Sequence, residues 1–187
     1  MSAIRFQSAT LVLIIINVIV FIPISINDTI LVLLAQNNLL VKEGFIWQLV
    51  TSMFVHFGIF HLLFNMFALY YFGSVIEYAY GKSRFLIIYF ISGITGNIAT
   101  YFLLPYNVLS GGASGAIFGL LGAYVILSRN VGGLGAALVY ALWVFLASSI
   151  IPGVNIVAHL IGLISGIISG AFLIRRGSPR VFTFYAS

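Results

Sequence analysis

The sequence predicts an all-α polytopic membrane protein that forms a single domain over residues 1–187. Hydrophobic residues make up 62% of the chain and charged residues only 6%. A soluble domain, by comparison, has about 25% charged residues. The apolar residues form long unbroken runs rather than the alternating segments of about ten residues that a membrane β-barrel needs. The composition therefore favours a bundle of helices in a lipid bilayer.

Six apolar segments come near the length of roughly 17–25 residues with which a helix crosses a bilayer. They cover residues 9–26, 61–79, 85–104, 113–128, 134–151 and 154–174, and we expect a bundle of six transmembrane helices with these approximate bounds. The first segment follows Arg5, and the apolar region of a signal peptide likewise follows basic residues. It is long for a signal peptide, and Ser25-Ile26-Asn27-Asp28 is a poor cleavage site, so we interpret it as a helix.

The connection between the first two helices, about residues 27–60, is far longer than the others. Long loops in compact proteins are usually functional or disordered, and this one is too apolar for disorder. We expect two short helices, over 30–41 and 45–54, that lie in the outer membrane interface. Trp47 would be an aromatic anchor there.

The basic residues predict the orientation, because Lys and Arg concentrate in cytoplasmic loops. Seven of the eight fall on one side of the predicted bundle and only Lys42 on the other. Both termini are then cytoplasmic, and we expect a multi-pass protein, most simply of the plasma membrane. The net charge of +5 does not indicate nucleic-acid binding, because the basic residues are scattered at the ends of the segments. The seven residues are Arg5, Lys82, Arg84, Arg129, Arg175, Arg176 and Arg180.

Ser114 is the first candidate catalytic residue, as a hydroxyl nucleophile. It lies in Gly111-Gly112-Ala113-Ser114-Gly115, where an outer loop becomes the predicted helix 113–128. Free backbone N–H groups at a helix start can stabilise a developing negative charge. The alternative is that these small residues only allow helices to pack closely in lipid.

Two histidines lie at the same predicted depth. His61 and Asn65 are four residues apart and share a helix face, although they could simply satisfy each other. His159 lies about five residues into the last predicted helix and is followed on one face by Gly162, Gly166 and Gly170. A second glycine row, Gly111, Gly115 and Gly119, lies on the helix of Ser114. Packing of the two rows would bring Ser114 and His159 together, although a lone histidine could also be a proton relay or a packing residue.

Other catalytic templates fit poorly. The chain has no cysteine, no His-Glu-x-x-His motif and no paired carboxylates in a helix, so we expect no metal and no cofactor. Glu77 lies near Lys82 and Arg84, which predicts a structural ion pair. The candidate site is therefore a Ser114–His159 dyad without a third member.

The chain resembles the rhomboid family of intramembrane serine proteases. The resemblance extends over the whole chain and is to the minimal six-helix form of the family. The matching motifs, in order, are His61-Leu62-Leu63-Phe64-Asn65, then Gly112-Ala113-Ser114-Gly115, then Ala158-His159-Leu160-Ile161-Gly162.

The resemblance implies a serine endopeptidase that cleaves transmembrane segments of other membrane proteins near the outer membrane face. Ser114 would be the nucleophile and His159 the base. His61, Asn65 and the Ser114 N–H would form the oxyanion hole. Two positions depart from the family pattern: Gln48 follows Trp47 where an arginine is common, and Phe118 stands where a tyrosine often supports the histidine.

Two other functions stay open: an inactive rhomboid-like binder of transmembrane clients, or a small channel or transporter. An inactive relative would be expected to lack Ser114 or His159. A transporter would usually show inverted repeats or charges within its helices, and the sequence shows neither. The oligomeric state stays open as well.

Overall fold

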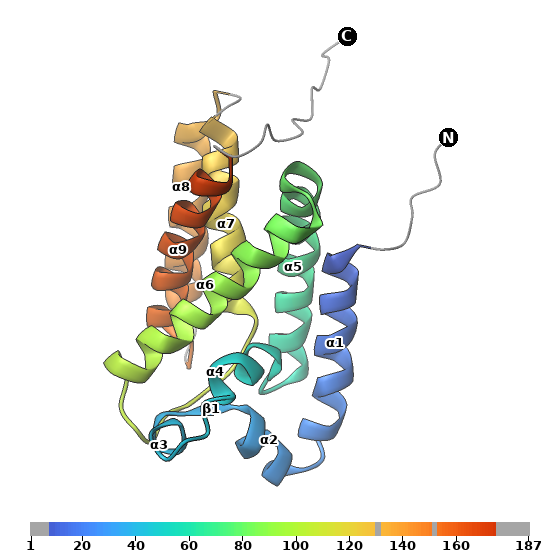
Figure 1. Ribbon diagram of the computed structural model, residues 1–187, viewed down its shortest axis with the longest axis vertical. Helices are drawn as coiled ribbons and strands as arrows, with labels where there is room; N and C mark the ends of the chain where they lie inside the picture. The colour runs from blue at the N-terminus through green and yellow to red at the C-terminus, as the bar shows by residue number, and fades with distance from the viewer. Residues whose placement is uncertain (1–7, 130–131, 151–152, 175–187) are drawn as a thin grey trace.

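The computed structural model describes residues 8–129, 132–150 and 153–174, and these residues form a bundle of helices (Figure 1). The predicted apolar segments all fall on its long helices. Arg5, Arg175, Arg176 and Arg180, on which part of the predicted orientation rests, lie outside the described residues. The long helices are α1 (Ala9–Ile24), α5 (Ile59–Tyr80), α6 (Lys82–Leu103), α7 (Ser114–Arg129), α8 (Leu134–Ser149) and α9 (Ile156–Ile174).

Within the described part of the chain, three helices are long and apolar enough to cross a membrane by themselves. These are α5, α6 and the Ile156–Leu173 part of α9. The helices α1, α7 and α8 are apolar but only 16 residues long. The chain is thus an all-α, polytopic membrane protein, as the sequence predicts.

The long connection is folded into short elements at one end of the bundle (Figure 1). In order they are α2 (Asp28–Leu34), β1 (Gln36–Asn37), α3 (Asn38–Lys42), α4 (Gln48–Thr51) and the 3-10 turn η1 (Ser52–Phe54). Strand β1 pairs antiparallel with β2 (Leu109–Ser110), so that Gln36 lies opposite Ser110. The loop therefore contacts the segment that leads directly into α7.

The prediction of one continuous helix over 30–41 is wrong, because the chain extends at Ala35 to form β1. The buried Gln36 amide explains the break: it donates to Asn38 Oδ1 and to the Asn97 carbonyl of α6, both at 2.9 Å. The helix expected over 45–54 begins only at Gln48. At Gln36 a tertiary hydrogen bond has overridden local helix propensity.

Gln48 anchors this connection although it stands where the family often has arginine. Its side chain is fully buried, and its amide donates to the Val32 carbonyl at 2.9 Å. Its Oε1 accepts from the Asn37 N–H, also at 2.9 Å. Trp47 is 42% exposed and its indole N–H donates to the Leu33 carbonyl. The loop is therefore held by neutral hydrogen bonds and needs no charge at position 48.

Glu77 has a structural role, but not the predicted one. Its carboxylate accepts from the backbone N–H groups of Ala9 and Thr10 and from the hydroxyls of Ser8 and Thr10, at 2.7–2.9 Å. The partners are therefore the free donors at the start of α1, rather than Lys82 and Arg84. A carboxylate is favourable at a helix N-terminus, where the unpaired N–H groups carry partial positive charge.

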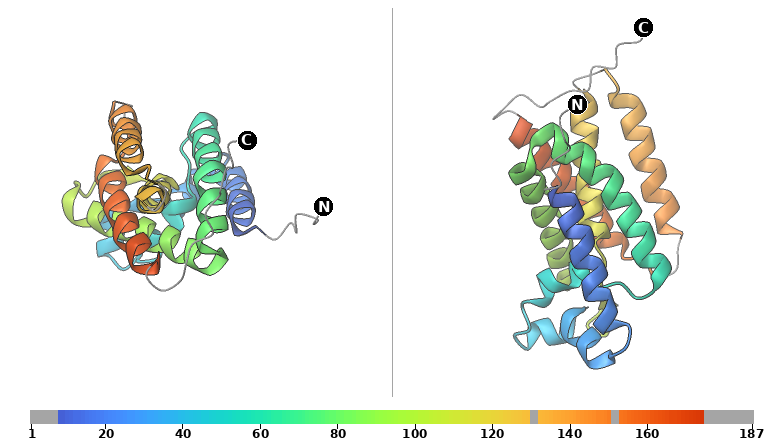
Figure 2. Two further views of the ribbon diagram at one scale, coloured as in Figure 1. Left: turned by 90° about the horizontal axis from the view of Figure 1, so that it is seen from above. Right: turned by 90° about the vertical axis from the view of Figure 1, so that its right-hand side faces the viewer.

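Helix α7 is the centre of the bundle. Seen from above, it lies among α5, α6, α8 and α9 (Figure 2, left), and it contacts each of them. Eleven of its 16 residues are buried, whereas only Ala137 and Ala141 are buried on the peripheral α8. Ser114 is the first residue of this enclosed helix.

Helices α7 and α9 pack backbone against backbone, as the two glycine rows predict. A Cβ on Gly162 would collide with the Gly115 carbonyl, and one on Gly166 would collide with the Gly119 carbonyl. Gly111 is an exception, because it lies before α7 and faces Val55. Only glycine permits so close an approach without moving one of the helices.

Gly166→Ala should therefore destabilise the protein. The new methyl group would meet a backbone carbonyl that cannot rotate away, and overpacking of this kind typically costs about 1–3 kcal/mol. Gly135→Ala in α8 is the control, since its Cβ would enter open space. We expect a lower melting temperature in detergent for Gly166→Ala and no loss for Gly135→Ala. Equal melting temperatures for wild type and Gly166→Ala would contradict the close α7–α9 contact.

Candidate functional site

The segment before Ser114 brings two predicted site residues together. Gly112 has a φ of +132°, which residues with a side chain rarely adopt. The Cβ that Gly112 lacks would lie 3.0 Å from His61 Nε2 and 3.5 Å from Ser114 Oγ. The His61 ring and the Ser114 hydroxyl therefore border the same small space beside Gly112, and any side chain at position 112 would both strain the backbone and fill that space.

His159 is buried in the first turn of α9, with 4% of its surface exposed. Asn155 fixes this turn, because its Oδ1 accepts from the Ala158 N–H at 2.9 Å. The Asn155 amide also donates to Thr100 on α6 and Ser110 on β2. The side chain of Asn155 therefore ties the start of α9 to α6 and to the strand before Ser114.

Ala158, next to His159, lies between two glycines. Its carbonyl would be 2.9 Å from a Cβ on Gly96 of α6 and 3.4 Å from a Cβ on Gly115 of α7. The backbone at His159 is thus packed tightly against α6 and lies within ordinary contact distance of α7. His159 precedes Gly162 by about one helical turn, and Ser114 precedes Gly115, so the α7–α9 crossing brings both to the same end of the bundle.

The His159 ring stacks on Phe118, with ring centroids 4.2 Å apart and planes inclined by 21°. Phe118 follows Ser114 by four residues and so shares its face of α7. The His159 ring therefore lies against the face of α7 that carries Ser114. Among the described residues Ser114 Oγ makes no hydrogen bond, so the hydroxyl is not joined to His159 here. Such bonds are often long without substrate and tighten in the complex.

Asn65 is buried on the same face of α5 as His61. Its amide donates one hydrogen bond to the His61 carbonyl, at 2.9 Å. An amide NH₂ has two donors, so the second is available to a ligand. Within the described ranges, the Asn65 Oδ1 is buried without a hydrogen-bond partner.

The start of α7 supplies further donors. The first intrahelical bond runs from Ile117 N–H to the Ala113 carbonyl, at 3.0 Å. By their position, the N–H groups of Ser114, Gly115 and Ala116 have no acceptor within the helix. The fourth free donor at this helix end, the Ala113 N–H, points to His56 Nε2 at 3.5 Å.

His56 and Asn155 are two buried or half-buried polar residues near the site that were not among the predicted site residues. His56 is 2% exposed, and its ring lies 4.9 Å from that of His61, centroid to centroid. Burial, and to a lesser degree the nearby His61, lowers the pKa of His56 from 6.5 to about 3, so the ring stays neutral at physiological pH. The polar residue before an apolar helix could have indicated Asn155 as a cap. No local pattern distinguishes His56.

Comparisons with known proteins identify the family of this chain. Residues 43–176 match the family description Rhomboid domain. The chain belongs to the rhomboid family.

Its similarity to named rhomboids extends over most of the chain. It is 40% identical over 149 residues to YdcA of Bacillus subtilis (strain 168), covering 76% of this chain and 75% of YdcA. It is 38% identical over 164 residues to Rhomboid protease GluP of the same organism, covering 84% of this chain. RHOMBOID-like protein 1 of Arabidopsis thaliana is 36% identical over 160 residues, or 76% of this chain. The matches span only 31% of GluP and 41% of the Arabidopsis protein.

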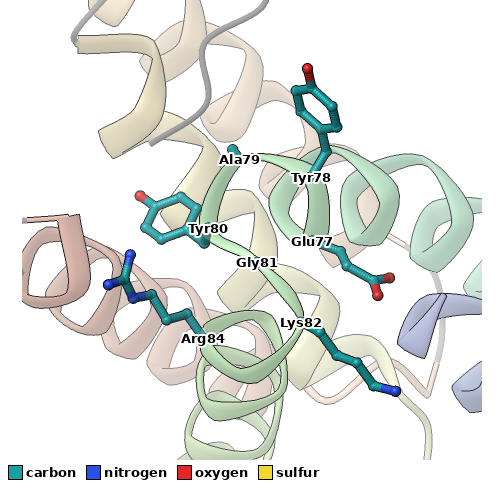
Figure 3. A pocket seen from close by; sticks show the side chains of 7 residues that line it. All are labelled: Glu77, Tyr78, Ala79, Tyr80, Gly81, Lys82 and Arg84. Carbon is teal, nitrogen blue, oxygen red and sulfur yellow. The ribbon is translucent and has the colours of Figure 1, made fainter. Parts of the chain in front are cut away.

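A hollow of about 420 Å³ lies at the other end of this rhomboid (Figure 3). It surrounds the α5–α6 turn and is lined by residues between Glu77 and Arg84. His61 begins α5 and Glu77 is near its end, so none of the candidate site residues reaches the hollow. In the described part of the chain, no three His, Asp or Glu side chains converge as metal ligands would.

The stability of this rhomboid should depend on the protonation of His56. The pKa of His56 is about 3 in the folded protein, below the ordinary 6.5, so the unfolded chain takes up the proton first as pH falls. The contribution of His56 is therefore complete above pH 6.5 and decreases as pH falls towards 3. We expect the wild-type melting temperature to fall over this interval more steeply than that of His56→Gln, whose amide oxygen can still accept from Ala113. Parallel curves for the two proteins would contradict the assignment of a neutral, buried His56.

Proposed function

We propose that this rhomboid is an intramembrane serine protease that uses a dyad of Ser114 and His159. Ser114 Oγ attacks the peptide carbonyl while His159 accepts its proton, and His159 then protonates the leaving amine. GluP, a similar protein, is named a rhomboid protease. Some rhomboids are inactive, but this chain retains both members of the dyad.

One observation carries the proposal: the stacking of His159 on Phe118, on the Ser114 face of α7. It depends on the glycine-mediated contact of α7 and α9, which sets the depth of both residues. Packing alone would require no open space beside Ser114. The glycine at 112, by contrast, keeps the space between His61 and Ser114 open.

The donors around this space suit a tetrahedral oxyanion. His61 Nε2 borders it directly, Asn65 has a second amide hydrogen, and the Ser114 N–H belongs to the free end of α7. Donors fixed by a folded scaffold need no reorganisation when negative charge develops. We assign His61, Asn65 and the Ser114 N–H to the oxyanion hole. We assign Phe118, Gly112, Gly115 and Gly162 to the support of the site as a whole.

We further propose that all six long helices cross the bilayer, with both termini cytoplasmic and the site near the outer face. Helix α7 has 16 residues, or about 24 Å at 1.5 Å per residue, whereas the hydrocarbon core is about 30 Å thick. A helix enclosed by protein can be shorter than the bilayer. Its first residue, Ser114, would then lie a few ångströms below the outer surface.

The substrates would be transmembrane segments of other proteins. A peptide carbonyl within a helix is already hydrogen-bonded and is shielded by side chains, so the segment must unwind before Ser114 can attack it. We therefore expect substrates with helix-breaking residues, which ease unwinding, or small residues, which shield the carbonyl least, near the outer face. The chemistry proposed for the dyad needs no metal or cofactor.

Removing either member of the dyad should abolish proteolysis. Ser114→Ala and His159→Ala each eliminate the activated nucleophile, because the two residues act as a unit. The measurement is cleavage of a single-span model substrate by purified protein in detergent, with labelling by a fluorophosphonate as a second readout. Melting temperatures near that of wild type would exclude unfolding. Full cleavage by Ser114→Ala would contradict the proposed mechanism.

His61→Ala and Asn65→Ala should slow turnover but not abolish it. Loss of one oxyanion donor typically reduces kcat by about 10²–10³-fold. We expect kcat to fall more than KM rises, and fluorophosphonate to label Ser114 more slowly. Phe64→Ala, on the exposed surface of α5, is the control. If His61→Ala were inactive while His159→Ala kept activity, the two histidines would have to exchange roles.

A further inference from the structure

Helix α8 is loosely attached to the bundle, yet its last turn contacts the proposed catalytic base. Its outward surface carries large exposed apolar residues, including Val139 and Trp143, and only two of its residues are buried. Ser148 Oγ nevertheless lies 3.2 Å from His159 Nδ1. Phe145, one turn earlier, packs edge-on against Phe118, with centroids 6.1 Å apart. The last turn of α8 therefore flanks the stacked pair of His159 and Phe118.

We propose that Ser148 is a positioning residue that fixes the tautomer and the ring orientation of His159. This inference rests on the proposed function, because it assigns to Ser148 an effect on a catalytic histidine. The chain has only three histidines, so the state of the His159 ring can be measured directly.

The hydrogen of the Ser148 hydroxyl determines the tautomer. That hydroxyl donates to the Phe145 carbonyl at 2.8 Å. A serine hydroxyl has one donor and two acceptor lone pairs, so towards His159 its oxygen can only accept. The bond is therefore from His159 Nδ1–H to Ser148 Oγ. A neutral histidine with its proton on Nδ1 has a free lone pair on Nε2, which is the form that can accept the Ser114 proton.

The same bond selects the orientation of the ring. Stacking on Phe118 fixes the plane of the imidazole, but a ring flipped by about 180° stacks almost equally well, since terminal ring torsions are broad and roughly two-fold. The flip would exchange Nδ1 with a ring carbon and turn Nε2 away. The hydrogen bond to Ser148 is lost in the flipped ring, so Ser148 favours one of the two orientations.

Ser149 provides a matched control. It is the next residue of α8, is also half-buried, and also donates to the Phe145 carbonyl at 2.8 Å. Among the described residues, Ser149 makes no hydrogen bond to His159. A comparison of the two serines therefore separates an effect on the histidine from an effect on the end of α8.

The activity test uses Ser148→Ala, Ser148→Thr and Ser149→Ala, purified in detergent. Loss of one neutral hydrogen bond predicts a fall of about 3–10-fold in kcat and in the fluorophosphonate labelling rate for Ser148→Ala, with KM little changed. Ser148→Thr keeps the hydroxyl and should recover most of the loss. Ser149→Ala should equal wild type. Equal rates for Ser148→Ala and wild type, or equal losses in both alanine variants, would overturn the inference.

A spectroscopic test does not depend on proteolysis. In ¹⁵N-histidine-labelled protein, the His159 signals are assigned by their loss in His159→Gln. We expect a neutral ring protonated at Nδ1 in wild type and in Ser149→Ala, and a mixture of both tautomers in Ser148→Ala. An unchanged tautomer in Ser148→Ala would overturn the role of Ser148 even if the protein is an active protease. An inactive wild type with the expected signals would instead refute the proposed function alone.

Discussion

The direct contact of the α7 and α9 backbones is the constraint on which the rest of the structure depends. Gly115 and Gly119 meet Gly162 and Gly166 with no side chain between them. In lipid, helices gain little from excluding water, so their association relies on close packing, and small residues permit it. The crossing fixes where the two helices begin relative to each other, and hence where Ser114 and His159 lie.

A second constraint is the hydrogen-bonded framework at the same end of the bundle. Side-chain amides, rather than charges, connect its parts: Gln48 joins α4 to α2, Gln36 joins β1 to α6, and Asn155 joins α9 to α6 and β2. Leaving a polar group unpaired away from water costs free energy. Each of these amides is therefore held in the position where its hydrogen-bond partners lie. The long connection therefore supports the strand that leads to Ser114.

The helices of the bundle differ in how many of their residues are buried. Helix α7 is enclosed and α9 is held against it, while α8 has mostly exposed apolar side chains. A helix with few buried contacts opens at lower free energy than the core. Among the long helices, the proposed nucleophile thus lies on the most enclosed one, and the base contacts the least enclosed one through Ser148.

The sequence by itself determined the class of fold, the long helices, the family motifs and the facing of two glycine rows, because long apolar runs and regularly spaced small residues are visible in the local sequence. It did not reveal the break at Ala35, the cap that Glu77 forms on α1, or the burial of His56. These were decided by partners far along the chain: Asn97 for Gln36, Ala9 for Glu77 and Ala113 for His56. A polar side chain carries no local sign of the distant donor or acceptor that will satisfy it, so only the tertiary structure decides that pairing.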